Sequence, residues 1–359
     1  MYSLPNKLQG FVPYKPLTGE YRVRLDVNES YHELPTDEVI HAVMEIGRVK
    51  LNRYPDPYAT DTINEFSNLF GTESRYVTAG NGSDELIGLI AAGLLEKGSK
   101  VLTLSPDFTM YGFYSRLYEL EVDDLPKNTD FEVDIDETLE YINNNNIKCL
   151  MFSNPCNPTS LGVEKSEVMR LVVEAGKKGV LIVVDEAYMD FWDESQSTLN
   201  EVSNYDNLIV LRTCSKSVAL AGIRLGFAVA CERITSALKT IKSPFNVNSL
   251  SQAIGAAVLS DTIGYRKSIA HIKESTNTLA LGLLGLSKLG VFEKIYDTKT
   301  NFVFAKVEKA VEIYEFLLER GVAVRCFPPN HLRICAGTRE EMNILCRELA
   351  VWQIQELEG

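Results

Sequence analysis

A lysine between two serines stands just after an apolar run that is typical of a buried strand. The run covers residues 207–211 (NLIVL), and Lys216 follows it with Ser215 and Ser217 on either side. Open α/β sheets bind ligands at the carboxyl ends of their strands, so this lysine is expected at a ligand-binding edge. Its amine could form an imine with an aldehyde, while the hydroxyls and nearby Arg224 could bind a phosphate. A surface lysine in a serine-rich turn is the alternative interpretation.

Two further apolar runs end in residues that could complete a site for a phosphorylated aldehyde. Residues 180–184 (VLIVV) precede Asp185, whose carboxylate could pair with a protonated pyridine nitrogen and keep that ring a strong electron sink. An N-capping aspartate at a helix start is the alternative. Residues 148–152 (KCLMF) precede a loop with two Asn-Pro pairs, which favours a rigid, non-helical backbone. In this loop Asn157 could donate its amide to a ring oxygen, unless the loop is an ordinary turn.

A glycine-rich segment follows a fourth predicted strand. Residues 76–79 lead into residues 80–85 (GNGSDE) and then into an apolar helix. Glycines before a helix N-terminus let backbone N–H groups approach a phosphate, and the helix dipole favours the anion, so Gly82, Ser83 and Asp84 are expected to bind one. The motif alone does not identify the ligand. Together, an imine-forming lysine, a carboxylate, an amide and a phosphate cradle at four strand ends predict pyridoxal 5'-phosphate as the cofactor.

The order of these motifs resembles that of the fold-type I pyridoxal-phosphate aminotransferases and is most similar to that of the histidinol-phosphate aminotransferases. The resemblance extends from about residue 23 to residue 349. Its motifs are LDVNE at 25–29, RYPDP at 53–57, GNGSDE at 80–85, NPCNPT at 154–159, DEAY at 185–188, SK at 215–216, LAGIRLG at 220–226, PFNVN at 244–248 and LRI at 332–334. As an ordered set they are specific for the cofactor site.

The coarse pattern of the chain agrees with the fold that this resemblance implies, an α/β fold with a mainly parallel sheet. From about residue 50 to 255, apolar runs alternate with helical patterns, which predicts right-handed βαβ crossovers. Residues 249–289 are expected to form one or two helices. The predicted C-terminal elements are strands over 301–305, 322–325 and 332–336 and helices over 310–320 and 340–357. They should form an α+β unit that packs with the N-terminal arm.

The length of the chain, 359 residues, is enough for two domains. The pattern predicts a large cofactor-binding domain over 46–255. A small α+β domain is expected to consist of residues 1–45 together with residues 256–359.

The resemblance implies a role for each residue of the cofactor site. Lys216 would hold the cofactor as an imine and later move a proton between substrate and cofactor. Asp185 would pair with the ring nitrogen, and Tyr188 would bond to the ring oxygen beside Asn157. The expected catalytic residues are therefore Lys216, Asp185 and Tyr188.

Four more residues are implied to contact the cofactor. Phe108 would stack on the ring, although a loop phenylalanine can also be part of the core. Ser215 and Arg224 would bind the phosphate, the arginine as a bidentate donor. Tyr54, in a proline-bounded loop, would reach the cofactor phosphate of the neighbouring subunit. This last role implies a homodimer with shared active sites.

The substrate site is expected around two arginines. Arg333 lies in an apolar strand (LRI), where an unpaired charge is costly, so an anionic group of the substrate should pair with it. Arg325, in VAVR, is the second candidate, and two arginines that converge on one dianion favour a phosphorylated substrate. Tyr14 and Asn28 are expected to complete the site.

Two glycines follow the family pattern, and two other features depart from it. Gly222 and Gly226 are expected to be positions at which another group approaches the backbone closely. The short segment 326–331 between the two arginines departs from many relatives. Ser160 stands where the Asn-Pro loop usually carries glycine, a departure that is expected to be minor.

The implied reaction transfers the amino group of histidinol phosphate to 2-oxoglutarate, a step of histidine biosynthesis. A transaminase for aromatic or other amino acids stays open, as does a decarboxylase of threonine phosphate, because these enzymes share nearly all of the cofactor residues. A non-catalytic module on a decayed transaminase fold is a further alternative. The intact Lys216 and Asp185 argue against it.

Composition restricts partners and location. A net charge of −13 argues against a nucleic-acid partner. No stretch approaches 18 uninterrupted apolar residues, and residues 1–19 lack a signal-peptide apolar segment, so no membrane association is expected. Seven cysteines are scattered without a pairing pattern and are typical of reduced thiols in a cytoplasmic protein. The four histidines show no metal-binding spacing, and no metal is expected.

Overall fold

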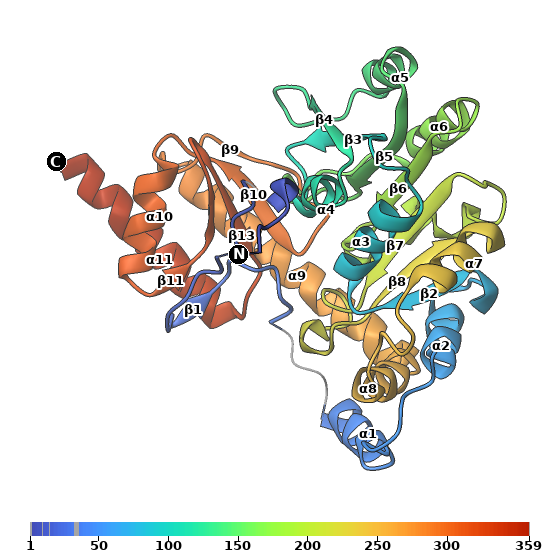
Figure 1. The fold of residues 1–359 in the computed structure, drawn as a ribbon. Coiled ribbons are helices and arrows are strands. Elements are labelled where there is room, and N and C mark those ends of the chain that lie inside the picture. The colour runs from blue at the N-terminus through green and yellow to red at the C-terminus, as the bar shows by residue number, and fades with distance from the viewer. Residues whose placement is uncertain (1, 9, 14, 32–35, 359) are drawn as a thin grey trace.

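The computed structural model describes residues 2–8, 10–13, 15–31 and 36–358 and folds them around two sheets (Figure 1). The larger sheet has seven strands, the smaller has four, and two further strands form a short ribbon. The two sheets lie on opposite sides of the molecule, and the long helix α9 (Thr262–Ser287) runs from one toward the other.

The larger sheet is mainly parallel, as the alternating pattern predicts. In the order of their hydrogen bonding, its strands are β2 (Val77–Gly80), β8 (Gly226–Ala230), β7 (Leu208–Thr213), β6 (Leu181–Asp185), β5 (Ile147–Ser153), β3 (Lys100–Ser105) and β4 (Glu121–Pro126). Strand β8 is antiparallel to β2 and β7, and the other adjacent pairs are parallel. The carboxyl ends of β2, β3, β5, β6 and β7 therefore meet at one edge.

Burial on both faces explains the continuous apolar runs of the central strands. Leu208 and Val210 of β7 belong to one hydrophobic core, whereas Ile209 and Leu211 belong to the core on the opposite face. The first core is covered by α2 (Thr60–Phe70), α5 (Ile135–Asn144), α6 (Lys165–Gly176) and α8 (Ser249–Leu259). The second is covered by α3 (Ser83–Gly93), α4 (Met110–Leu117) and α7 (Glu232–Ile241).

The smaller sheet is antiparallel and has its own hydrophobic core. Its strands are β12 (Arg325–Phe327), β13 (His331–Cys335), β10 (Phe302–Lys306) and β9 (Lys294–Ile295), and α9, α10 (Ala310–Glu319) and α11 (Arg339–Glu358) pack with it. Strand β1 (Val23–Arg24) pairs in parallel with β11 (Val322–Ala323). This pairing confirms that the N-terminal arm packs with the C-terminal unit.

The predicted division into 46–255 and the remainder stays a prediction. The separate core of the smaller sheet supports it. Helix α1 (Thr36–Ile46), by contrast, lies beside α8, on the side of the larger sheet (Figure 1). Short 3-10 turns complete the described elements, at Asn6–Leu8, Ser74–Tyr76, Met189–Phe191, Glu194–Gln196, Leu199–Glu201 and Ala221–Ile223.

A buried cluster of charges holds together the ends of β6 and β7. Arg212 donates to Asp190 at 2.5 Å and lies 3.4 Å from the carboxylate of Glu186. The backbone N–H of Thr198 also donates to Glu186, at 2.7 Å. Asp190 in turn accepts a hydrogen bond from the hydroxyl of Ser217. Because Ser217 follows Lys216 directly, this cluster fixes the loop that carries the lysine.

Replacing Arg212 by methionine should lower the free energy of unfolding by about 3–5 kcal/mol, because two buried carboxylates lose their cation. The unfolding midpoint in urea, followed by circular dichroism, measures this. Arg233→Met is the matched control, since the Arg233–Asp206 pair is 3.3 Å long but its side chains are 74 % and 80 % exposed. That change should cost about 1 kcal/mol or less. Equal losses for the two variants would contradict the role of the cluster.

Candidate active site

A cavity of about 460 Å³ lies at the carboxyl edge of the larger sheet, where the sequence predicts ligand binding. Loops that follow β2, β3, β5, β6 and β7 form one wall, and residues of β12, β13 and the arm after β1 form the other. The predicted site residues that line it are Asn28, Ser83, Asp84, Phe108, Asn157, Asp185, Tyr188, Ser215, Lys216, Arg224, Arg325 and Arg333. Residues up to 305 positions apart in the chain thus share one cavity.

Two of the predicted site residues that the structure describes, Gly82 and Tyr54, are not part of the cavity lining. Gly82 lies just behind it, against Arg224. Tyr54 lies elsewhere, beside a second hollow of about 510 Å³, where its ring is 82 % exposed and stacks on Phe245 at 4.6 Å. Tyr14 lies outside the described residues.

The amine of Lys216 faces the cavity and donates one long hydrogen bond within the described structure. Its Nζ donates to the carbonyl oxygen of Val27 at 3.2 Å and lies 5.9 Å from the ring of Tyr188. The hydroxyl of Tyr188 accepts a hydrogen bond from Asn28 at 3.0 Å. Among the described residues the lysine therefore has no carboxylate partner, and its amine is available for covalent chemistry.

Asp185 is a buried carboxylate without a cationic partner in the described part of the chain. It accepts hydrogen bonds from the Tyr111 hydroxyl at 2.9 Å and from the Ala187 backbone N–H at 3.1 Å. Burial raises the pKa of Asp185 to about 7, although both hydrogen bonds oppose the rise. A protonated ring nitrogen placed beside this carboxylate would supply the missing positive charge.

Sequence reasoning missed Tyr111. It lies in the first turn of α4, three positions after Phe108, and the two rings meet edge to face at 5.6 Å. The spacing of three along a helix start is a signal that could have suggested that both rings face the same site. The contact with Asp185, 74 positions further along, follows from strand order alone.

The predicted phosphate cradle includes two glycines, Gly82 and Gly226, at which a Cβ would lie too close to neighbouring atoms. Gly82 has φ +81°, and a Cβ there would lie 2.8 Å from Nη2 of Arg224. A Cβ at Gly226 would lie 2.5 Å from the backbone nitrogen of Ser83, at the start of α3. Close approach at Gly226 is therefore confirmed. The same expectation for Gly222 stays a prediction, because no protein atom would lie within 4 Å of a Cβ there and the residue lines the cavity.

Arg325 and Arg333 occupy directly paired positions on β12 and β13. A tight hairpin, the segment 326–331, produces this pairing. Nη2 of Arg333 donates to the carbonyl oxygen of Asp26 at 2.7 Å, and Nη1 donates to Oδ1 of Asn157. Within the described residues neither arginine has a carboxylate partner, and Nε of the buried Arg333 has no hydrogen bond. Burial and the neighbouring Arg325 both lower the pKa of Arg333, and an anion beside the two arginines would oppose this effect.

Asn157 contributes to two halves of the site at once. Its Oδ1 accepts from Arg333, which leaves its Nδ2 as the donor available to the cavity. The same loop contains Ser160, which is fully buried and has φ +65°. This left-handed conformation accounts for the glycine usual at that position.

The donor set around the cavity fits pyridoxal phosphate. A reactive amine, a buried carboxylate lacking a cation, and a glycine-walled helix N-terminus with an arginine match the aldehyde, the ring nitrogen and the phosphate in turn. Comparison with known proteins agrees. The model of the family "Aminotransferase class I and II" matches residues 22–349, and the chain belongs to this family. It is a pyridoxal-phosphate-dependent aminotransferase.

The names of individual relatives are more specific than that of the family. The chain is 37 % identical over 349 residues to a histidinol-phosphate aminotransferase of Clostridium kluyveri, covering 96 % of each chain. It is 36 % identical over 338 residues to one of Clostridium novyi, covering 93 % of this chain and 92 % of the relative. The solved histidinol-phosphate aminotransferase of Sinorhizobium meliloti, in complex with pyridoxal phosphate, has a TM-score of 0.88 at 21 % identity over 99 % of both chains. The last likeness shows the shared fold.

The described helices include none with the length and apolar character needed to cross a bilayer.

The raised pKa of Asp185 predicts how the stability of the cofactor-free protein depends on pH. In the cofactor-free protein this carboxyl has a pKa of about 7 when folded and about 3.8 when unfolded, so the folded state binds the extra proton between these values. Its contribution to stability is therefore lost as the pH rises from about 4 to 7. Asp185→Asn should raise the melting temperature of the cofactor-free protein more at pH 8 than at pH 5, and it should weaken cofactor binding. An effect independent of pH would contradict this.

Glu186→Gln is the matched control for the chemistry of Asp185. Glu186 faces away from the cavity, toward Arg212 and Thr198. We expect this variant to be less stable, while the folded enzyme keeps its half-reaction rate far better than Asp185→Asn does. Single-turnover absorbance measurements on folded protein separate the two effects.

Proposed function

We propose that this protein transfers the amino group of histidinol phosphate to 2-oxoglutarate, a step of histidine biosynthesis. The observation that carries the proposal is the pair of arginines at directly opposed positions on the cavity wall, without a carboxylate partner in the described chain. A phosphate dianion suits two converging guanidinium groups. The names of the relatives at 36 % and 37 % identity support the same substrate.

The assignment of the cofactor-binding residues is part of the proposal. Lys216 would hold the cofactor through its amine and Asp185 would bind the ring nitrogen. Asn157 and Tyr188 would bind the ring oxygen, with Phe108 beside the ring. The phosphate would be bound by Gly82, Ser83, Asp84, Ser215 and Arg224, the aspartate through its backbone N–H, because its carboxylate lies 3.5 Å from Arg224.

Bound in this way, the cofactor supplies an electron sink for the carbon that carries the amino group. Lys216 is the base that accepts the proton from that carbon and later returns a proton. The carbonyl of Val27, at 3.2 Å, keeps the lysine amine at the cavity wall between these transfers. Asp185 keeps a proton on the ring nitrogen, because the neutral alternative would leave its own charge buried and unpaired.

The substrate residues act by orientation. Arg333 is held by Asp26 and Asn157, so its guanidinium is fixed before any anion arrives. Arg325 lies on the more exposed strand and would close the other side of the phosphate. Asn28 donates to Tyr188 and would limit the space around the substrate amine. A role for Tyr14 stays a prediction.

Arg333→Ala should lower kcat/KM for histidinol phosphate by at least about thirtyfold, because losing one partner of a buried charged hydrogen bond costs roughly 2–5 kcal/mol and 1.4 kcal/mol is about tenfold. Histidinol, which has no phosphate, should lose less. Arg320→Ala is the control, since this arginine pairs with Glu348 away from the cavity.

A panel of amino donors with 2-oxoglutarate tests the function itself. Histidinol phosphate should be the preferred donor. Faster turnover of phenylalanine or tyrosine would make the protein an aromatic aminotransferase whose arginines bind a carboxylate. Release of carbon dioxide from threonine phosphate would make it a decarboxylase.

A homodimer with shared sites belongs to the same proposal. Exposed apolar side chains gather on and after α1, at Val39, Val43, Met44, Leu51, Tyr54 and Tyr58. A second copy of the chain would cover this surface and bring Tyr54 to its neighbour's cofactor phosphate. A cytoplasmic location is also proposed, and it is supported by the seven cysteines, none of which forms a disulfide in the described structure.

Hybrid dimers test the shared site. Lys216→Ala and Tyr54→Ala homodimers should each be nearly inactive. Co-expression of the two chains should restore activity, because each hybrid dimer has one site with both native residues. An active monomer in light scattering, or no recovery from folded hybrids, would contradict the arrangement.

A further inference from the structure

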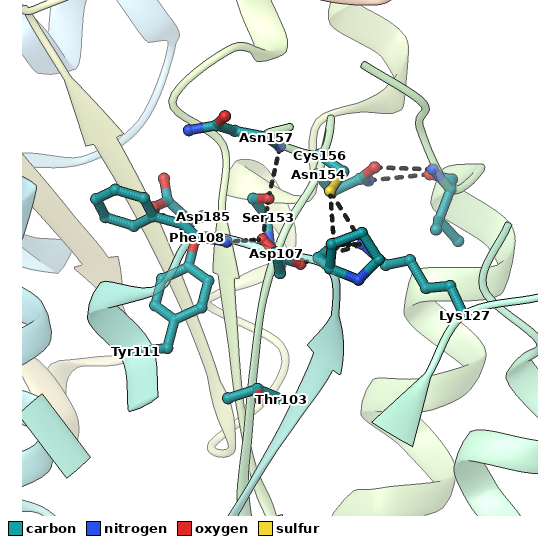
Figure 2. A network of polar contacts seen from close by, with 12 residues as sticks. Thr103, Asp107, Phe108, Tyr111, Lys127, Ser153, Asn154, Cys156, Asn157 and Asp185 are labelled. Atoms are coloured by element: carbon teal, nitrogen blue, oxygen red, sulfur yellow. Dashed lines mark hydrogen bonds and ion pairs between the residues drawn. The ribbon is translucent and has the colours of Figure 1, made fainter. Parts of the chain in front are cut away.

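A buried lysine and a cysteine touch each other directly behind the wall of the cofactor cavity (Figure 2). Nζ of Lys127 lies 2.9 Å from Sγ of Cys156, and the lysine side chain is 2 % exposed. The same Nζ donates to the carbonyl oxygen of Pro106 at 2.8 Å and lies 3.4 Å from a carboxylate oxygen of Asp107. All three donors of the ammonium group are thus used, and one of them points at sulfur.

This contact distinguishes Cys156 from the other cysteines. Burial alone raises the pKa of Cys149 far above its ordinary value, which makes that thiol inert. Among the cysteines of the described chain, Cys156 is the one whose sulfur accepts a hydrogen bond from an ammonium group. An oxidised sulfur at this distance from a lysine nitrogen is placed to bond to it, because sulfenic acids condense with nitrogen to give sulfenamides.

We propose that Cys156 and Lys127 form an oxidative cross-linking site, in which hydrogen peroxide converts the pair to a sulfenamide. The sulfur attacks one peroxide oxygen, so that an S–O bond forms and the O–O bond breaks, and the second oxygen leaves as water with the proton of the thiol. The lysine nitrogen then attacks sulfur, an S–N bond forms, the S–O bond breaks and a second water leaves. One thiol, one amine and one peroxide thus give one S–N bond and two waters, with sulfur oxidised by two electrons and peroxide reduced by two.

Asp107 supplies the proton acceptor for the second step. Lys127 must lose a proton before its nitrogen can attack, and Asp107 is the carboxylate beside it. Burial raises the pKa of Asp107, which improves it as an acceptor. Cys156 is only 4 % exposed, so a small uncharged oxidant is the kind that suits this site.

The cross-link would reach the cofactor site through hydrogen bonds. Asp107 accepts from the backbone N–H of Phe108 at 2.7 Å and of Ser153 at 3.2 Å. The hydroxyl of Ser153 accepts from the backbone N–H of Asn157 at 3.1 Å. The sulfenamide nitrogen carries no positive charge and Asp107 has taken the lysine proton, so the ion pair is lost and Asp107 becomes a weaker acceptor for the groups that donate to it. Phe108 and Asn157, both in the cavity wall, would then lose their common anchor.

Peroxide treatment of the holoenzyme followed by non-reducing peptide mapping tests the proposal. We expect the peptide that contains Lys127 to be joined to the one that contains Cys156, with a mass equal to their sum less two hydrogens. A thiol reductant should cleave the link and restore activity. Cys156→Ser enzyme should keep its activity at the peroxide dose that inactivates the unmodified enzyme, and Cys231→Ser enzyme should cross-link normally.

Lys127→Arg is the decisive variant, because it keeps the cation beside sulfur but removes the amine. Peroxide should then oxidise Cys156 without joining the two peptides. Sulfinic acid alone on Cys156 of the unmodified enzyme, or no modification there, would overturn the proposal. A link that is heavier by one oxygen would overturn the sulfenamide step.

Discussion

Buried charges without partners are the constraint on which the site depends. A buried ion costs several kcal/mol unless another charge and hydrogen bonds compensate it. This protein compensates Arg212 fully, with Glu186 and Asp190, and leaves Asp185 and Arg333 incompletely compensated at the cavity. The first arrangement stabilises the loop that carries the lysine. The second leaves a buried carboxyl and a buried guanidinium at the cavity, and a bound cation and a bound anion would compensate them.

Hydrogen bonds at the cavity connect the two halves of the molecule. Arg333 comes from the smaller sheet and binds Asn157, which follows a strand of the larger one. Asn28, on the arm after β1, donates to Tyr188 beyond the end of β6. Because each half contributes residues that need partners in the other, the relative position of the sheets decides whether the cavity is complete. Ser160 adds a further contact, since the backbone of Lys299 donates to its carbonyl oxygen at 2.9 Å.

Residues of the loop after β5 contact the cavity, the smaller sheet and the buried Asp107. Asn157 lines the cavity and accepts a hydrogen bond from Arg333, and the backbone N–H of Ser153 donates to Asp107. Cys156 stands between these residues and faces away from the cavity, toward Lys127. A chemical change at the back of the loop is therefore two hydrogen bonds away from the residues that would orient the cofactor.

The sequence by itself determined β5, β6 and β7, the mainly parallel character of their sheet and the residues at their carboxyl ends, including Lys216, Asp185 and Asn157. These follow from local signals, namely apolar runs of strand length and the turn residues after them. Tertiary structure decided the rest. The bond from Tyr111 to Asp185, the opposition of Arg325 to Arg333 and the contact of Lys127 with Cys156 join residues between 8 and 74 positions apart. Strand order and register set these pairs. The packing of separate elements also decides that the space around Gly222 is open. No local pattern encodes such distances, because each depends on how separate elements pack against one another.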